Sequence, residues 1–162
     1  MKIEPEAANH HSSVRELLVE AFPSSAEADL VDQLRRDDDA TISQVATENG
    51  RVIGHVIFSR MDAPFPSLGL APVAMTPGKR RQGVAAALIK EGLRRAKAQG
   101  WEAVFVVGDP AYYQRFGFRT DEAAAFVSPY AGPNLMVLSL TEHGLPIRTG
   151  RIDYAPAFSA VG

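Results

Sequence analysis

A strand, a long helix and a second strand follow one another between residues 68 and 107, and this unit constrains the fold more than any other part of the chain. Leu68 to Met75 is a short apolar run. From about Arg81 to Gln99, apolar residues recur at three- and four-residue steps, which is helical spacing. Ala103 to Val107 is a second apolar run of strand length. Two strands joined through one helix are expected to be parallel, with a right-handed crossover.

Shorter segments on both sides of this unit complete the expected fold. Further strands are predicted at residues 2–4, 41–47, 52–59, 118–120 and 135–140, and further helices at residues 14–22, 25–34 and 110–116. A turn at residues 48–51 should join two of the strands into a hairpin. We therefore predict an α/β fold, a mixed central β-sheet flanked by helices, in one domain over residues 1–162. The part from about residue 141 is expected to be irregular.

Composition argues against several classes of protein. The chain has no cysteine, so disulfides, thiolate metal ligands and a cysteine nucleophile are excluded. Its four histidines lack metal-ligand spacing, and its formal net charge of −2 gives no argument for nucleic-acid or membrane binding. No apolar run approaches the roughly 20 residues that span a bilayer. We expect a cytoplasmic protein without metal, nucleic-acid or membrane partners.

A basic turn, residues 80–85, opens the long helix directly after the first strand of the central unit. The backbone N–H groups at a helix start have no intrahelical partners and carry the positive end of the helix dipole. Such a turn can bind a phosphate or pyrophosphate, and the small Gly83 and Ala85 let a ligand approach the backbone. The alternative is an ordinary solvated helix start.

A second distinctive segment, residues 108–118, follows the second strand of that unit. Asp109 suits the N-cap of a short helix, and Pro110 suits its first turn. Gly117 suits the helix stop. Tyr113 stands four residues before the Gly117-Phe118 pair.

Together the two segments resemble the GCN5-related N-acetyltransferases (GNAT superfamily), in particular their YhbS-like branch. Arg80, Gly83 and Ala85 fill the acyl-CoA signature Arg/Gln-x-x-Gly-x-Gly/Ala, and Tyr113 occupies the place of the family's tyrosine. The resemblance covers about residues 2 to 140. It implies the GNAT-like acyl-CoA N-acyltransferase fold and acetyl-CoA as cosubstrate. It also implies direct acetyl transfer to a primary amine in a ternary complex.

The resemblance also implies the site residues. The cofactor would bind to Val73, Ala74, Met75, Arg80, Arg81, Gln82, Gly83, Val84 and Ala85. Its pantetheine arm would lie along a strand edge left free where the next strand splays away, and Pro72, which has no N–H, is consistent with an interrupted ladder. A backbone N–H near Ala74 or Met75 would polarise the thioester carbonyl. Tyr113 would act as general acid toward the departing thiolate, whereas Tyr112 is interpreted as a packing residue.

The general base is the least defined part of this interpretation. Residues 67–75 hold no Asp or Glu, although many members of the family supply a carboxylate there. His55 on a neighbouring strand is a candidate because the ordinary pKa of histidine suits a base. Glu48 and Asp62 are weaker candidates, and a water relay without a single base is equally open.

The acceptor amine, a small molecule or a peptide, is expected in a cleft formed by residues 22–34, 63–67 and 128–135. Glu27, Asp29 and Asp32 would either attract a cationic amine there or form an ordinary solvated helix face. The alternative to an enzyme is a non-catalytic acyl-CoA-binding or sensing domain. A nucleotide-phosphate binder that uses the same helix start is a weaker hypothesis. Monomer and homodimer both stay open.

Overall fold

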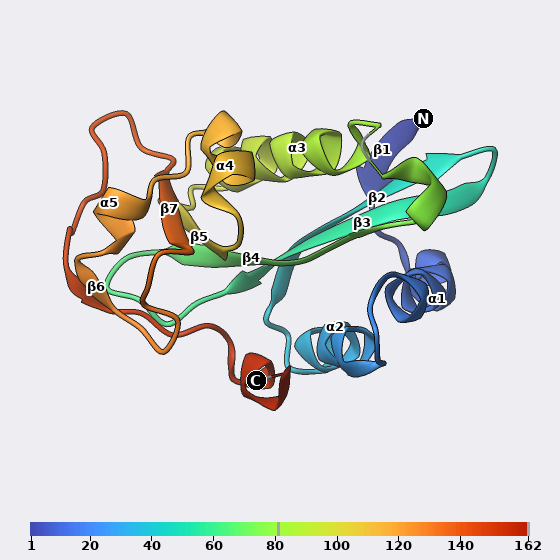
Figure 1. Cartoon of the computed structure of the whole chain (residues 1–162), viewed down its shortest axis with the longest axis horizontal. Coiled ribbons are helices and arrows are strands. Elements are labelled where there is room, and N and C mark those ends of the chain that lie inside the picture. The colour runs from blue at the N-terminus through green and yellow to red at the C-terminus, as the bar shows by residue number, and fades with distance from the viewer. Residues whose placement is uncertain (81, 162) are drawn as a thin grey trace.

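A six-stranded mixed sheet forms the centre of the molecule in the computed structural model, which describes residues 1–80 and 82–161 (Figure 1). The sheet has the order β1-β2-β3-β4-β5-β7. Its strands are β1 (Lys2–Pro5), β2 (Ala40–Glu48), β3 (Arg51–Arg60), β4 (Ser67–Met75), β5 (Ala103–Val107) and β7 (Leu135–Ser139). The helices are α1 (His11–Ala21), α2 (Ala26–Arg36), α3 (Val84–Ala98), α4 (Pro110–Tyr113) and α5 (Thr120–Ala123). The 3₁₀ helices are η1 (Ala8–His10), η2 (Pro77–Lys79), η3 (Gln114–Phe116) and η4 (Pro156–Val161).

The predicted strand–helix–strand unit is confirmed. β4 and β5 pair in parallel, and α3 connects them. Each of the other pairings in this sheet is antiparallel. The predicted mixed α/β architecture is therefore correct.

Helices cover both faces of the sheet. α3 packs on β2 and β3 on one face, whereas α1 and α2 lie on the other (Figure 1). The predicted apolar faces of α1 and α2 are buried, including Leu18 and Leu34, which are fully inaccessible. One core therefore lies beneath α3 around Phe58 and Leu88, and a second lies beneath α1 and α2 around Ile57. A third core surrounds the Phe105 ring at the end of the sheet.

One part of the predicted secondary structure is wrong. No strand forms at residues 118–120: Arg119 makes an isolated bridge to Val137, and α5 begins at Thr120. The segment after residue 141 contains short ordered elements, β8 (Gly150–Arg151) and η4. Strand β8 pairs with β6 (Phe126–Val127) in a small parallel sheet, and Ile152 is fully buried. Within the described residues, no helix has both the length and the apolar character that crossing a membrane requires.

Candidate functional site

β4 and β5 separate partway along their length. Their pairing joins Ser67–Gly69 to Ala103–Phe105 and stops there. Beyond Gly69, β4 continues to Met75 paired with β3 alone, so its other edge is open (Figure 1). The splayed strand edge that the resemblance implied is therefore present.

Pro72 lies at a bulge in this open part of β4. Val56 of β3 is opposite Val73, whereas Phe58 is opposite Leu70. Two residues of β4 therefore face one residue of β3. Proline has no backbone N–H for a ladder and is confined to edges and bulges, which explains its position here.

The ladder also decides which backbone groups of β4 face the open edge. The N–H of Thr76 donates to the carbonyl of Ile53 on β3 at 2.9 Å. Backbone groups along an antiparallel strand alternate between its two sides. Those of Ala74 therefore point toward β3, and those of Val73 and Met75 point toward the open edge. This orientation favours Val73 and Met75 over Ala74 as donors to a bound ligand.

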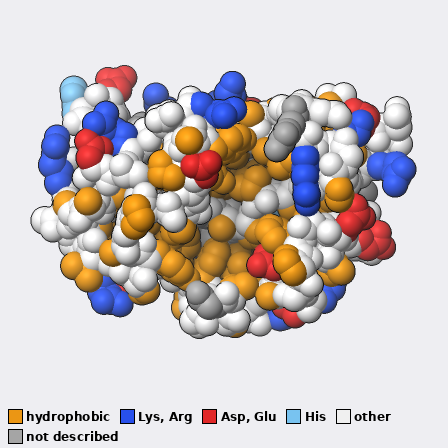
Figure 2. Space-filling view, viewed as in Figure 1, with side chains coloured by type: hydrophobic (Ala, Val, Ile, Leu, Met, Phe, Trp, Pro, Cys, Tyr) orange, Lys and Arg blue, Asp and Glu red, His pale blue; other side chains and the backbone are white. Residues whose placement is uncertain are grey.

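A cavity of about 640 Å³, here called the α3 cavity, lies between this edge, the start of α3 and α4. It is lined by Val73, Met75, Arg80, Gly83, Val84, Ala85, Ala86, Tyr112, Tyr113 and Arg115. Figure 2 shows the hollow on this face of the molecule, where hydrophobic side chains gather below Lys and Arg side chains on the rim. Its volume is in the range of small-molecule and cofactor sites.

Six of the nine predicted cofactor residues line the α3 cavity: Val73, Met75, Arg80, Gly83, Val84 and Ala85. The other three do not. The Ala74 side chain packs into the core beneath α1. The Gln82 side chain is exposed and donates to the carbonyl of Gly78 at 3.1 Å. Arg81 lies outside the described residues.

Gly83 shapes the start of α3. It is the N-cap residue and has φ 79° and ψ 5°, a left-handed conformation that side chains other than Asn and Asp rarely adopt. The helix therefore begins at Val84, three residues later than predicted. The first helical bond runs from the N–H of Ala87 to the carbonyl of Gly83. The N–H groups of Val84, Ala85 and Ala86 therefore have no intrahelical partner and are available to an anion.

Two arginines add positive charge to the α3 cavity. Arg80 comes directly before the α3 turn, and Arg115 lies across the cavity after α4. Arg115 is held in place because its Nε donates to the carbonyl of Tyr112 at 2.9 Å and its guanidinium lies 4.3 Å from the centre of the Tyr112 ring. Arg115 was not among the predicted site residues, and its only sequence signal was a basic residue close to the tyrosine pair.

α4 places Tyr113 at the centre of the site. Asp109 caps the helix by accepting from the N–H of Ala111 at 3.0 Å, and Gly117 ends the segment with φ 100°. Both predicted helix ends are confirmed. Burial, with a smaller contribution from the neighbouring Tyr112, raises the pKa of Tyr113 to about 12. The Tyr113 hydroxyl therefore keeps its proton at neutral pH and can donate it.

The interpretation of Tyr112 as a packing residue covers only part of its role. Tyr112 also lines the α3 cavity. The two rings meet edge to face, with centroids 5.1 Å apart. Tyr112 thus packs against Tyr113 as predicted, but it also contributes to the cavity wall.

A second cavity of about 330 Å³, here called the α2 cavity, adjoins the first. Its lining residues are Phe22, Glu27, Leu30, Leu70, Ala71, Pro72, Val73, Val107, Tyr113, Tyr130, Phe158 and Val161. Val73 and Tyr113 line both cavities, so the two spaces meet at these residues.

The walls of the α2 cavity agree only in part with the predicted cleft. Residues from the predicted segments 22–34 and 128–135 are present. The segment 63–67 does not contribute, because Phe65 is buried against the Phe105 ring. Phe158 and Val161 of η4, which the sequence analysis did not identify, complete the wall instead.

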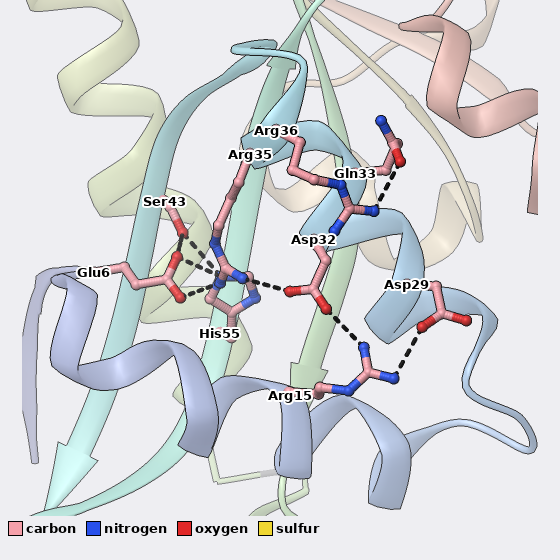
Figure 3. A network of polar contacts seen from close by, with 9 residues as sticks. All are labelled: Glu6, Arg15, Asp29, Asp32, Gln33, Arg35, Arg36, Ser43 and His55. Carbon is pink, nitrogen blue, oxygen red and sulfur yellow. Dashed lines mark hydrogen bonds and ion pairs between the residues drawn. The ribbon is translucent and has the colours of Figure 1, made fainter.

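His55 lies away from both cavities. Its side chain is fully buried beneath α1 and α2, in the polar network that Figure 3 shows. Its Nε2 lies 2.9 Å from Ser43 Oγ and 3.5 Å from Glu6 Oε1. This geometry does not support His55 as a base that reaches a substrate amine.

The two weaker candidate bases also lie outside the cavities. Lys79 Nζ lies 2.7 Å from Glu48 Oε1, and its hydrogen bond and charge hold the pKa of Glu48 below the ordinary value. Asp62 is exposed, and its backbone pairs with Asp153. Among the described residues, no group of three or more His, Asp or Glu side chains is arranged to hold a metal ion.

Comparisons with known proteins agree with this geometry. The sequence model of the acetyltransferase (GNAT) family matches residues 11–118. The uncharacterized N-acetyltransferase YhbS of Escherichia coli strain K12 is 43% identical over 149 residues, which cover 88% of this chain and 89% of that protein.

Two crystal structures share the whole architecture. One is the Escherichia coli GNAT family N-acetyltransferase YhbS in complex with CoA, with a TM-score of 0.93 and 35% identity over 99% of this chain and 93% of that one. The other is a GNAT family acetyltransferase from Brucella melitensis in complex with acetyl-CoA. It gives a TM-score of 0.82 and 28% identity, covering 97% of each chain.

Proposed function

Because the chain belongs to the GNAT family of acetyltransferases, we propose that it transfers an acetyl group from acetyl-CoA to a primary amine by direct transfer in a ternary complex. The observation that carries this proposal is the meeting of the two cavities at Val73 and Tyr113. A cofactor in one cavity and an amine in the other would bring the thioester and the nucleophile together beside a proton-bearing phenol.

The α3 cavity suits acetyl-CoA. The free N–H groups at the start of α3, with Arg80 and Arg115 nearby, offer a site for the negatively charged phosphates. The open edge of β4 offers the backbone groups of Val73 and Met75 to the amides of the pantetheine arm, as a neighbouring strand would. The relatives crystallised with CoA and acetyl-CoA support this assignment.

The groups that lie where the two cavities meet, at Val73 and Tyr113, suggest how the transfer step proceeds. The amine, after loss of one proton, attacks the thioester carbonyl carbon and forms the C–N bond. A backbone N–H of Val73 or Met75 stabilises the negative charge that develops on the carbonyl oxygen. The C–S bond breaks, and the Tyr113 hydroxyl donates its proton to the departing thiolate. The attacking nitrogen releases its second proton to solvent as the amide forms, and Tyr113 regains a proton from solvent. An ammonium and acetyl-CoA thus yield an amide, CoA and one released proton.

A thiol-release screen of primary amines with acetyl-CoA tests the proposed function. Acetyl-CoA should also raise the melting temperature of the protein by mass action, whereas NAD should not. The alternative hypothesis, a non-catalytic acyl-CoA-binding domain, draws support from the lack of a carboxylate on β4. It predicts the same shift in melting temperature but no acceptor-dependent thiol release.

Charge at position 83 should control cofactor affinity. Asp and Asn are matched in size and both tolerate the left-handed conformation of Gly83. We expect Gly83→Asp to bind acetyl-CoA at least about tenfold more weakly than Gly83→Asn, because only the carboxylate repels the phosphates. Calorimetric titration at two salt concentrations measures this difference, which should shrink at the higher one. Equal affinities of the two variants would place the phosphates elsewhere.

Gly108 should control the position of the Tyr113 ring. A Cβ atom at position 108 would lie 2.5 Å from Tyr113 Cε2, so Gly108→Ala must displace that ring. Small misplacements of catalytic groups can cost up to about 10²-fold in rate. We expect Gly108→Ala to lower turnover while acetyl-CoA affinity stays near that of the parent protein.

A double-mutant cycle makes this expectation specific. If Gly108→Ala acts through the Tyr113 hydroxyl, it should cost little further turnover in a Tyr113→Phe background. An undiminished additional loss would show that Gly108→Ala acts through some other part of the protein.

A further inference from the structure

We propose that the acceptor is a primary amine with one positive charge and an apolar body, and that Glu27 binds its ammonium group in the α2 cavity. This inference rests on the proposed function and names the acceptor class of that site. Four features of the α2 cavity carry it: its walls, its volume, the pairing of the nearby carboxylates, and the charges among its lining residues.

The walls of the α2 cavity are mostly apolar. Phe22 directly follows α1, Leu30 lies on α2, and Val107 ends β5, where it is 44% exposed. A chain of edge-to-face aromatic contacts backs the cavity: Tyr130 on Tyr154 at 5.3 Å, and Tyr154 on Phe158 at 5.1 Å. Such rings favour an apolar or aromatic occupant.

The volume of this cavity limits the size of the occupant. At about 330 Å³ it is roughly twice the 150 Å³ of an engineered apolar cavity that holds one benzene ring. It therefore has room for a ring and a short aminoalkyl arm. An extended peptide or an oligosaccharide would have to lie largely outside it.

Ion pairs distinguish Glu27 from the other acidic residues of α2. Arg15 binds both Asp29, at 2.9 Å, and Asp32, at 2.7 Å (Figure 3). Arg35 also binds Asp32, at 3.0 Å. Glu27, by contrast, has no ion-pair or hydrogen-bond partner among the described residues. It is half-buried and faces the cavity, so its carboxylate is available to a bound ammonium.

The charges of the lining residues disfavour amines that carry a further charge. Among the described residues that line the α2 cavity, Glu27 is the only charged one, and none is Lys, Arg or His. The carboxylate of a free amino acid would lose its hydration there without gaining a cationic partner. A second ammonium group on a diamine would likewise meet an apolar wall. Both costs select an amine with a single charge.

Two matched pairs of amines test this selection on the full-length protein with acetyl-CoA. Phenethylamine and phenylalanine differ by a carboxylate, and hexylamine and diaminohexane differ by a second ammonium. We expect the monoamine of each pair to have a KM lower by about tenfold or more, because an unpaired charge is costly to desolvate. Calorimetric titration of each amine into the CoA-bound protein measures its Kd in the absence of acetyl transfer.

Substitution of Glu27 tests the ammonium site. A hydrogen bond to a charged group corresponds to roughly 10–100-fold in affinity, so Glu27→Gln should raise the KM and the Kd for the monoamines by that factor. Glu27→Asp, which keeps the charge, should restore part of the loss. Glu20→Gln is the matched control, because Glu20 is exposed on α1 and lines neither cavity. It should leave both constants unchanged.

The outcomes separate the inference from the proposed function. Glu27-dependent binding of monoamines without acetyl transfer would support the ammonium site and overturn the proposed function. Acetyl transfer with a preference for phenylalanine or the diamine, or with a KM unaffected by Glu27→Gln, would support the function and overturn the inference. Failure of both monoamines to bind or react would also overturn the inference.

Discussion

Tyr113→Phe is expected to lower the rate of acetyl transfer by roughly 10²–10⁴-fold, the usual contribution of general acid–base catalysis. The substitution keeps the ring, which packs against Phe118 with centroids 5.8 Å apart, and removes only the hydroxyl. Burial raises the pKa of this hydroxyl to about 12, so the parent protein carries the proton throughout the neutral range. The variant would have to expel an unprotonated thiolate. Its affinity for acetyl-CoA should stay close to that of the parent.

Single-turnover acetyl transfer measures this effect without interference from product release. Tyr112→Phe is a demanding control, because Tyr112 lines the same cavity and is also partly buried. We expect that variant to transfer acetyl at nearly the parental rate. Unchanged chemistry in Tyr113→Phe would remove Tyr113 from the mechanism, and a selective loss in Tyr112→Phe would assign the proton to the other tyrosine.

The elements around the α3 cavity could be predicted from sequence because they are local. Gly83 leads directly into α3, and residues 108–118 contain the two short helices α4 and η3. Short-range signals fix such structures: Gly83 takes a left-handed conformation, Asp109 caps α4 and Gly117 ends the following turn. The parallel connection of β4 and β5 likewise follows from the periodicity of a single continuous segment.

The walls of the α2 cavity could be predicted only in part, because they are built from segments far apart in the chain. η4 packs on α2 and brings Phe158 and Val161 into the cavity wall. The pattern after residue 141 has too few periodic residues to indicate this contact. Sequence also left open whether Glu27, Asp29 and Asp32 bind an amine. Arg15, which lies on α1, pairs with Asp29 and Asp32. This contact between two helices separates the two aspartates from Glu27.

The surroundings of His55 could not be predicted from the sequence either. Its position on β3 was predicted, and alternation along a strand gives two sets of side chains on opposite faces. Alternation alone does not say which helices cover each face. α1 and α2 cover the face that carries His55, and the chain before α1 brings Glu6 within 3.5 Å of its ring. The partner of His55 in the buried network, Glu6, therefore lies far from it in the sequence, and no local pattern indicates the contact.

The same network leads to the second large effect: Glu6→Gln should lower the free energy of unfolding by roughly 3–5 kcal/mol, the usual cost of removing one partner of a buried ion pair. The Glu6 side chain is only 3% exposed. It accepts a hydrogen bond from Ser43 Oγ at 2.6 Å, lies 3.5 Å from His55 and forms an ion pair with Arg35. The amide of this variant carries no charge, so Arg35 and His55 would lose the carboxylate that they contact.

The pH dependence of stability gives a second measurement of this effect. Burial alone would raise the pKa of Glu6, but hydrogen bonding and charge from His55, together with Ser43 and Arg35, lower it from 4.5 to about 2. Because the folded pKa lies below the ordinary one, the carboxylate stabilises the fold above about pH 4.5, and this contribution is lost as the pH falls toward 2.

Urea unfolding at several pH values should show the free energies of unfolding of the parent and of Glu6→Gln converging over that interval. Glu4→Gln, a change at a surface pair with Lys2, should have a much smaller effect. A constant difference between parent and Glu6→Gln down to the lowest pH would mean that the charge of Glu6 is not what stabilises the network.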